Sequence, residues 1–199
     1  MEGQVKMIAV VRGAPSAMVQ ELFRMLVDRW KPAVRVAGVI AESHGLADRA
    51  CSAGFLRNIS TGELFPIFRD LGAGSTACHL EGAGALAAAE AVRQDVAAGC
   101  ELVVLSKFGK LEAAGRGLAN AFKAAVEAQV PLLTSVSPAF EEAWAKLGGP
   151  LFSALSADAA EIDAWRQAVR SRAAIDSASP PAGFLQSTSG LIYSVTNER

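Results

Sequence analysis

The stretch that decides the fold is LVVLSKFGKLE, residues Leu102–Glu112. Its first four residues, Leu102–Leu105, are all apolar, which predicts a strand that is buried on both faces. Such a strand belongs in the middle of a parallel sheet covered by helices on both sides. The polar residues Ser106 and Lys107 follow at once, and Gly109 opens a loop. Ligands of parallel sheets bind beyond the carboxyl ends of the strands, so this loop is the first place to look for a site.

Strand and helix patterns alternate on either side of this stretch. Short apolar runs predict further strands at residues 5–11, 34–40, 131–136 and 150–155. Apolar residues spaced three and four apart predict helices at about 16–30, 83–98, 114–129 and 158–169. This alternation predicts an α/β domain of three layers, in which helices cover both faces of a parallel sheet of about five strands.

A β-hairpin interrupts the alternation at about residues 54–69. Extended stretches at 55–59 and 64–68 flank Ser60-Thr61-Gly62, a loop length and composition typical of hairpins. We expect the domain to span residues 1–176. From residue 177 to 199 the chain is rich in Ser, Pro, Gly and Thr without a helical period, which predicts an irregular C-terminal tail.

Charge and hydropathy exclude several classes of function. The chain of 199 residues carries 19 Lys and Arg against 20 Asp and Glu, a net charge of −1, so no overall field attracts nucleic acid or anionic lipid. No apolar run is long enough to cross a bilayer, and Met1–Val11 lacks the features of a signal peptide. We therefore expect a cytoplasmic protein that neither binds nucleic acid nor inserts into membranes.

The cysteines predict neither disulfides nor a zinc site. The chain has an odd number of cysteines, Cys51, Cys78 and Cys100. They are far apart in the sequence, and none belongs to a C-x-x-C pair. Cys100 precedes an apolar run and is expected to be a small buried residue. Cys78 lies beside His79, and the other histidine, His44, follows a predicted strand. We expect no metal site.

The first strand and helix flank a loop where a phosphate-binding P-loop would lie. Aligned from Gly13, the pattern G-x-x-x-x-G-K-[ST] requires glycine at position 18, lysine at position 19 and serine or threonine at position 20. The chain has Met18, Val19 and Gln20 there, so the phosphate-binding lysine and the magnesium-binding hydroxyl are missing. Arg12 and Ser16 remain candidate anion contacts.

The loop after residue 105 favours an anion over a metal ion. In P-loop nucleoside triphosphatases a carboxylate at this position holds magnesium. Ser106 is a poor substitute as a magnesium ligand, and Lys107 repels a cation. Lys110 and Arg116 add two more positive charges. The alternative is that these are solvated surface charges.

Three segments carry a family resemblance: GSTACHLE at Gly74–Glu81, KFGKLEAAGRG at Lys107–Gly117 and VPLLTSV at Val130–Val136. They resemble an uncharacterised bacterial family whose genes often lie beside molybdate-transport and nitrogenase genes. That family is similar to degenerate thermophilic-type P-loop nucleoside triphosphatases, whose Asp-Glu-Ile-Gly-Lys-Met-Glu-like run corresponds to this loop. Gly109, Lys110 and Glu112 match both groups, whereas Ser106 and Lys107 depart from the triphosphatases. The resemblance implies a P-loop-like fold and a link to molybdenum, but no established activity.

Three functions remain open. The favoured one is a non-hydrolytic accessory protein that binds an oxyanion such as molybdate, or a nucleotide, and that associates with molybdate-transport components. Its expected ligand contacts are Arg12, Gly13, Ser16, Ser75, Thr76, Cys78, His79, Lys107, Gly109, Lys110 and Arg116. The second is a nucleoside triphosphatase in which Glu112 positions the attacking water. The third is a regulatory or structural homodimer formed through the Ala-rich helix at 83–98.

Overall fold

The computed structural model describes residues 6–46, 53–69, 82–148 and 152–178. These residues form one seven-stranded sheet in the order β4-β3-β2-β5-β6-β1-β7. Its strands are β1 (Ile8–Val11), β2 (Val36–Ser43), β3 (Ala53–Asn58), β4 (Leu64–Pro66), β5 (Leu102–Phe108), β6 (Leu132–Val136) and β7 (Phe152–Leu155). The helices are α1 (Ser16–Trp30), α2 (Gly82–Ala98), α3 (Lys110–Ala113), α4 (Ala119–Glu127), the 3₁₀ turn η1 (Pro138–Phe140), α5 (Glu141–Gly148) and α6 (Ala159–Ala178).

The predicted parallel sheet is present and is part of a larger mixed one. The pairs β2·β5, β5·β6, β1·β6 and β1·β7 are parallel, which accounts for five strands. The predicted hairpin forms β3 and β4, and it does not stand apart from the sheet. β3 pairs antiparallel with β2, and β4 with β3, so the hairpin adds two strands at one edge.

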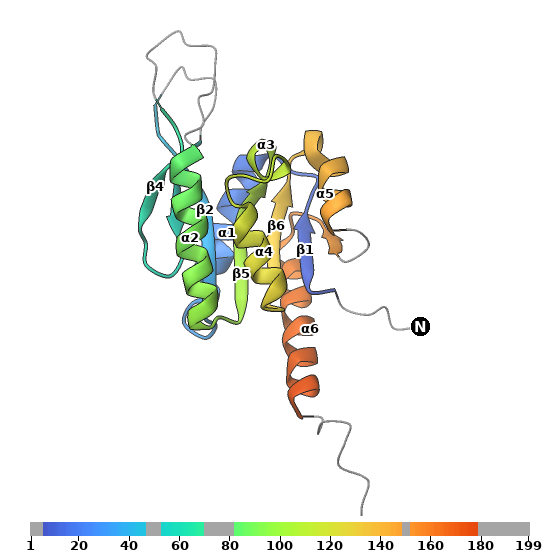
Figure 1. Ribbon diagram of the computed structural model, residues 1–199. Helices are drawn as coiled ribbons and strands as arrows, with labels where there is room; N and C mark the ends of the chain where they lie inside the picture. Colours follow the sequence, from blue (N-terminus) through green and yellow to red (C-terminus); the bar gives the residue numbers. More distant parts are fainter. Residues whose placement is uncertain (1–5, 47–52, 70–81, 149–151, 179–199) are drawn as a thin grey trace, which may run out of the picture.

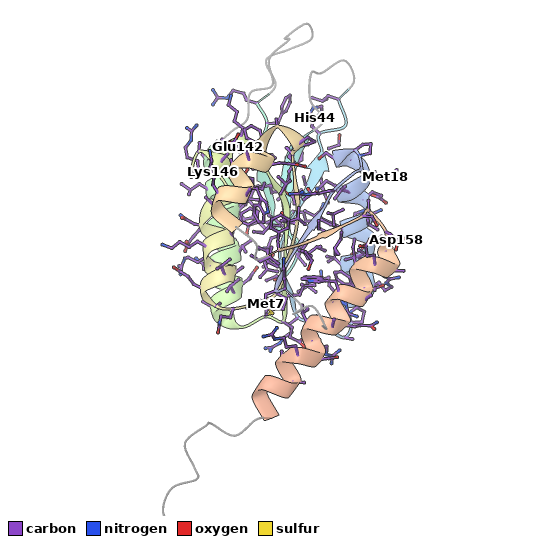
Figure 2. All side chains as sticks on the ribbon, turned by 90° about the vertical axis from the view of Figure 1, so that its right-hand side faces the viewer. Met7, Met18, His44, Glu142, Lys146 and Asp158 are labelled. Atoms are coloured by element: carbon purple, nitrogen blue, oxygen red, sulfur yellow. The ribbon has the colours of Figure 1, made fainter. Side chains whose placement is uncertain are left out.

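Helices cover both faces of the sheet (Figures 1 and 2). One core contains the inward residues of α2 and α4 together with Trp144 of α5, and the other contains those of α1 and α6. β5 supplies both cores, because Val103 and Leu105 face one and Leu102 and Val104 face the other. Burial on both sides explains why this strand is the strongest signal in the sequence.

Three helices differ from the sequence prediction. The helix expected at 114–129 is shortened to α4, at 119–127, because Gly115 and Gly117 adopt left-handed backbone conformations with φ of +69° and +57°. The short helix α3 lies before it, at 110–113, where the sequence predicted a loop. α6 continues to Ala178, two residues beyond the predicted domain boundary. The remainder of the predicted tail lies outside the described residues.

The carboxyl ends of the parallel strands meet at the upper edge of the sheet in Figure 1, where α3 also lies. In Figure 2, Met7, just before β1, marks the opposite end of the molecule from His44, just after β2. The candidate site lies at the carboxyl edge.

Candidate functional site

A cavity of about 830 Å³ lies along the carboxyl edge of the sheet. It is bordered by the start of α1, the end of β2, the loop after β5 and the turn η1. We call it the carboxyl-edge cavity. Residues at the carboxyl ends of three parallel strands contribute to it: Ser16 after β1, Lys107 and Gly109–Glu112 at the end of β5 and after it, and Ser137 after β6.

A β-bulge shapes the cavity where β5 ends. Leu105 pairs with Thr134 and Phe108 with Val136, so β5 has one residue more than β6 between these two pairs. Bulges of this kind change the direction of a side chain at the end of a strand. The two residues in the bulge are Ser106, which is buried, and Lys107, which is exposed and borders the cavity.

Gln20 of α1 fixes the position of this bulge. Its side-chain amide donates a hydrogen bond to the carbonyl oxygen of Ser106 at 2.7 Å and accepts one from the backbone N–H of Ala41 at 3.2 Å. The hydroxyl of Ser135 donates a second hydrogen bond to the same Ser106 carbonyl at 2.9 Å. The ends of β2, β5 and β6 are thereby tied to α1. Sequence reasoning missed Gln20 as a site residue, and its only signal was that it replaces the P-loop hydroxyl.

Glu112 holds together the loop between β5 and α4. The residue is 8% exposed. Its carboxylate accepts hydrogen bonds from the backbone N–H groups of Gly109 and Leu118, each at 3.0 Å. Gly117 permits this arrangement, because a Cβ atom there would lie 2.5 Å from Glu112 Oε1. The conformation of the KFGKLEAAGRG run is thus stabilised by its own glutamate.

The cations at the cavity differ in whether they are paired. Arg24 forms an ion pair with Glu21, and this pairing raises the pKa of Arg24 and lowers that of Glu21. Glu42 is paired with Arg57. Within the described segments, Lys107 and Lys110 have no carboxylate within ion-pair distance. Two exposed lysines without an ion-pair partner therefore border the cavity, together with the Glu112 carboxylate, which accepts hydrogen bonds from backbone N–H groups.

Four of the expected ligand contacts border the cavity: Ser16, Lys107, Gly109 and Lys110. At Gly109, an added Cβ would lie 3.7 Å from both Lys107 Cε and Glu112 Oε2, and 3.8 Å from the hydroxyl oxygen of Ser137. Their role in binding a ligand stays a prediction.

Three expected contacts do not border it. The Arg12 guanidinium lies 5.1 Å from the centre of the Phe152 ring and 3.9 Å from the Glu141 carboxylate, on the side of β7. Gly13 is exposed with a φ of +78°, and Arg116 is exposed in the turn before α4. Arg12 thus lies beside the edge strand β7, and the role of Arg12, Gly13 and Arg116 in binding a ligand also stays a prediction. Ser75, Thr76, Cys78 and His79 lie outside the described residues.

The face of α2 that was expected to bind a second copy is occupied by the chain itself. Gly84, Ala85, Ala88 and Ala89 are buried, and α2 packs on α4, β2, β3 and β4. Leu86, an apolar residue of the same helix, is 55% exposed. The small residues of α2 thus serve close packing inside the fold.

Two further observations concern the part of the chain that the structure describes. No cluster of three or more His, Cys, Asp or Glu side chains there is suited to hold a metal ion. None of its helices combines the length and apolar character that a membrane span needs.

Comparison with known proteins places the chain in a family. The model of the family described as "Protein of unknown function (DUF2478)" matches residues 8–165, and the chain belongs to this family. A segment of 115 residues is also 37% identical to the Molybdenum import ATP-binding protein ModC 2 of Bradyrhizobium diazoefficiens. That match covers 58% of this chain and 13% of the relative. No solved structure matches the chain.

Proposed function

We propose that this protein is a non-hydrolytic, P-loop-like domain that binds a small anionic molecule and acts as an accessory in molybdenum handling. The observation that supports anion binding best is the pair Lys107 and Lys110, which border the carboxyl-edge cavity and form no ion pair in the described structure. Unpaired ammonium groups at a concave surface attract anions. The first turn of α1, with Ser16, adds the partial positive charge of a helix start.

The loop after β1 supports binding without hydrolysis. At the P-loop lysine position stands Val19, which is 2% exposed and part of the core. At the hydroxyl position stands Gln20, whose amide is engaged with the backbone of β5 and β2. Neither residue is available to a triphosphate or to magnesium.

The role of Glu112 also argues against hydrolysis. Each of its carboxylate oxygens accepts a backbone hydrogen bond, so the residue stabilises the loop instead of orienting a water molecule. We infer that it is a structural residue that keeps Lys107 and Lys110 in place.

The link to molybdenum is supported by the similarity to a molybdenum import ATP-binding protein. Because the match covers only 13% of that relative, the association with molybdate-transport components is part of the proposal. The candidate ligands are molybdate, other tetrahedral oxyanions and nucleotides.

Isothermal titration calorimetry with molybdate, tungstate, sulfate, phosphate, ADP and ATP tests the proposal. We expect at least one anion to bind with a Kd below about 1 mM, and Lys107→Ala and Lys110→Ala each to weaken it about tenfold, as loss of a charge-assisted hydrogen bond does. The matched control is Lys123→Ala, since Lys123 is an exposed lysine of α4 paired with Glu127. Binding that is absent, or unchanged in both cavity variants, would contradict the proposal.

Hydrolysis is tested separately by phosphate release from ATP and GTP with magnesium. We expect none above the background of a buffer control. Release that disappears in a folded Glu112→Gln variant would instead favour the triphosphatase alternative.

A further inference from the structure

The size of the carboxyl-edge cavity does not match a free oxyanion. A water molecule takes up about 30 Å³ of liquid, so a five-atom tetrahedral oxyanion fills roughly 100 Å³. The cavity encloses about 830 Å³, within the range of about 300–1,000 Å³ that is typical of sites for small organic molecules.

The cavity also has an apolar part. Four buried apolar residues border it. Leu56 of β3, Ile67 after β4 and Ala85 of α2 belong to the core on the side of α2, and Ile40 of β2 belongs to the core on the side of α1. Leu118 and the half-buried Phe140 extend this lining. The two lysines without an ion pair come from different elements, because Lys107 is the next-to-last residue of β5, which ends at Phe108, and Lys110 begins α3.

An inorganic oxyanion would contact only the cationic part and leave the apolar part wet. A ligand that joins an anionic group to an apolar body would cover both, and the burial of its apolar surface would strengthen binding. Apolar walls combined with polar and charged groups are the usual design of a site for an organic ligand.

We propose that the cavity takes an organic phosphate, in which a phosphomonoester contacts Lys107 and Lys110 and a ring or aliphatic body covers the wall formed by Leu56, Ile67 and Phe140, on the α2 side of the sheet. This inference rests on the proposed function and specifies its ligand class. It predicts that free molybdate and inorganic phosphate are weak ligands of this cavity.

The test compares three probes by calorimetry: inorganic phosphate, phenyl phosphate and phenol. At about pH 8.5 both phosphates are dianions, because the second pKa of a phosphomonoester is about 6. We expect phenyl phosphate to bind at least tenfold more tightly than inorganic phosphate, and phenol to bind more weakly than phenyl phosphate.

Two variants separate the apolar contribution from the charge. Ala41→Phe fills the cavity from a partly buried position, and Phe140→Ala removes part of its wall. Each should lower the preference for phenyl phosphate over inorganic phosphate at least threefold and leave inorganic phosphate binding unchanged. Phe122→Ala is the matched control, because Phe122 is a half-buried phenylalanine that packs on Phe108 and Trp144, away from the cavity lining.

The outcomes distinguish this inference from the function on which it rests. If inorganic phosphate and phenyl phosphate bind with equal affinity, and Lys107→Ala abolishes the binding of both, the proposal of an organic ligand is wrong and anion binding stands. Phenol binding as tightly as phenyl phosphate, unaffected by Lys107→Ala, would overturn anion binding. Absence of binding by all three probes would overturn the organic phosphate, and anion binding would be overturned as well if molybdate, tungstate, sulfate, ADP and ATP also fail to bind.

Discussion

Gly117 is the residue on which the conformation of the cavity loop depends. Its φ of +57° lies in the left-handed region, and a Cβ there would approach Glu112 Oε1 to 2.5 Å and Leu111 Cβ to 2.8 Å. Gly115 also has a positive φ, +69°, but no heavy atom lies within 4 Å of its added Cβ. A substitution at Gly115 therefore introduces backbone strain alone, whereas one at Gly117 introduces strain and a close contact with Glu112.

We expect Gly117→Ala to lower the free energy of unfolding by about 2–4 kcal/mol, because left-handed strain and the displacement of Glu112 add together. Gly115→Ala, the control, should cost about 1–2 kcal/mol through strain alone. Urea denaturation monitored by tryptophan fluorescence measures both. Equal losses in the two variants would show that the contact with Glu112 does not constrain the loop.

Cys100 shows the effect of burial on a thiol. It is a free cysteine, half-buried between α2 and β5, and burial raises its pKa above the ordinary value, with nearby Asp95 acting in the same direction. A raised pKa means less thiolate at any given pH, so the residue should react slowly with alkylating reagents.

In a Cys51→Ser/Cys78→Ser chain, the alkylation rate of Cys100 by iodoacetamide should rise with pH along a curve whose midpoint lies above that of the same chain unfolded in urea. Mass spectrometry of samples quenched at different times gives the rate. A midpoint at or below that of the unfolded chain would contradict the effect of burial and of Asp95.

At the scale of elements, the sequence predicts where strands and helices lie better than which helix residues face inward. Met18 and Met25 of α1 belong to the apolar spacing but are 59% and 46% exposed, because Val19, Phe23 and Leu26 already fill the space against the sheet. The same holds for Leu86 of α2. Periodicity gives an apolar stripe, and the width of the stripe that is buried depends on how close the helix comes to the sheet.

The helix α2 lies very close to the hairpin strand β4. A Cβ on Gly84 would lie 1.7 Å from the carbonyl oxygen of Pro66 in β4. Gly82, two residues earlier in the helix, has nothing within 4 Å of its added Cβ. Gly84 is therefore required for contact between the helix and the strand.

We expect Gly84→Ala to lower the free energy of unfolding by about 1–3 kcal/mol, since α2 must shift away from β4. Gly82→Ala should change it by less than about 1 kcal/mol. Chemical denaturation of both variants decides this. A neutral or stabilised Gly84→Ala would mean that the helix and hairpin are not in close contact.

The order of elements in the whole molecule could be predicted from the sequence, and the composition of the site only in part. Leu102–Leu105 predicts the buried strand, and Ser60–Gly62 predicts the hairpin, because both depend on local patterns. Gln20 could not be predicted as a site residue, since its partners Ser106 and Ala41 are distant in the sequence. The position of Arg12 beside Phe152 of β7 could not be predicted for a related reason: which neighbouring strand its side chain faces depends on the strand order.

Ligand binding should be visible as stability of the whole domain. A ligand at 100 times its Kd stabilises the folded state by about 2.7 kcal/mol, which corresponds to a rise in Tm of about 5–10 °C for a domain of this size. We expect this rise with phenyl phosphate by differential scanning fluorimetry, and no comparable rise in the Lys107→Ala/Lys110→Ala double variant. The same rise in the double variant would place the ligand elsewhere.

Both outer strands of the sheet are short. β4 has three residues and ends at Pro66, which has no N–H to donate, and β7 has four residues. An exposed strand edge can recruit strands of other chains, and short edges with proline discourage this. We therefore expect the folded protein to resist ordered aggregation at high concentration.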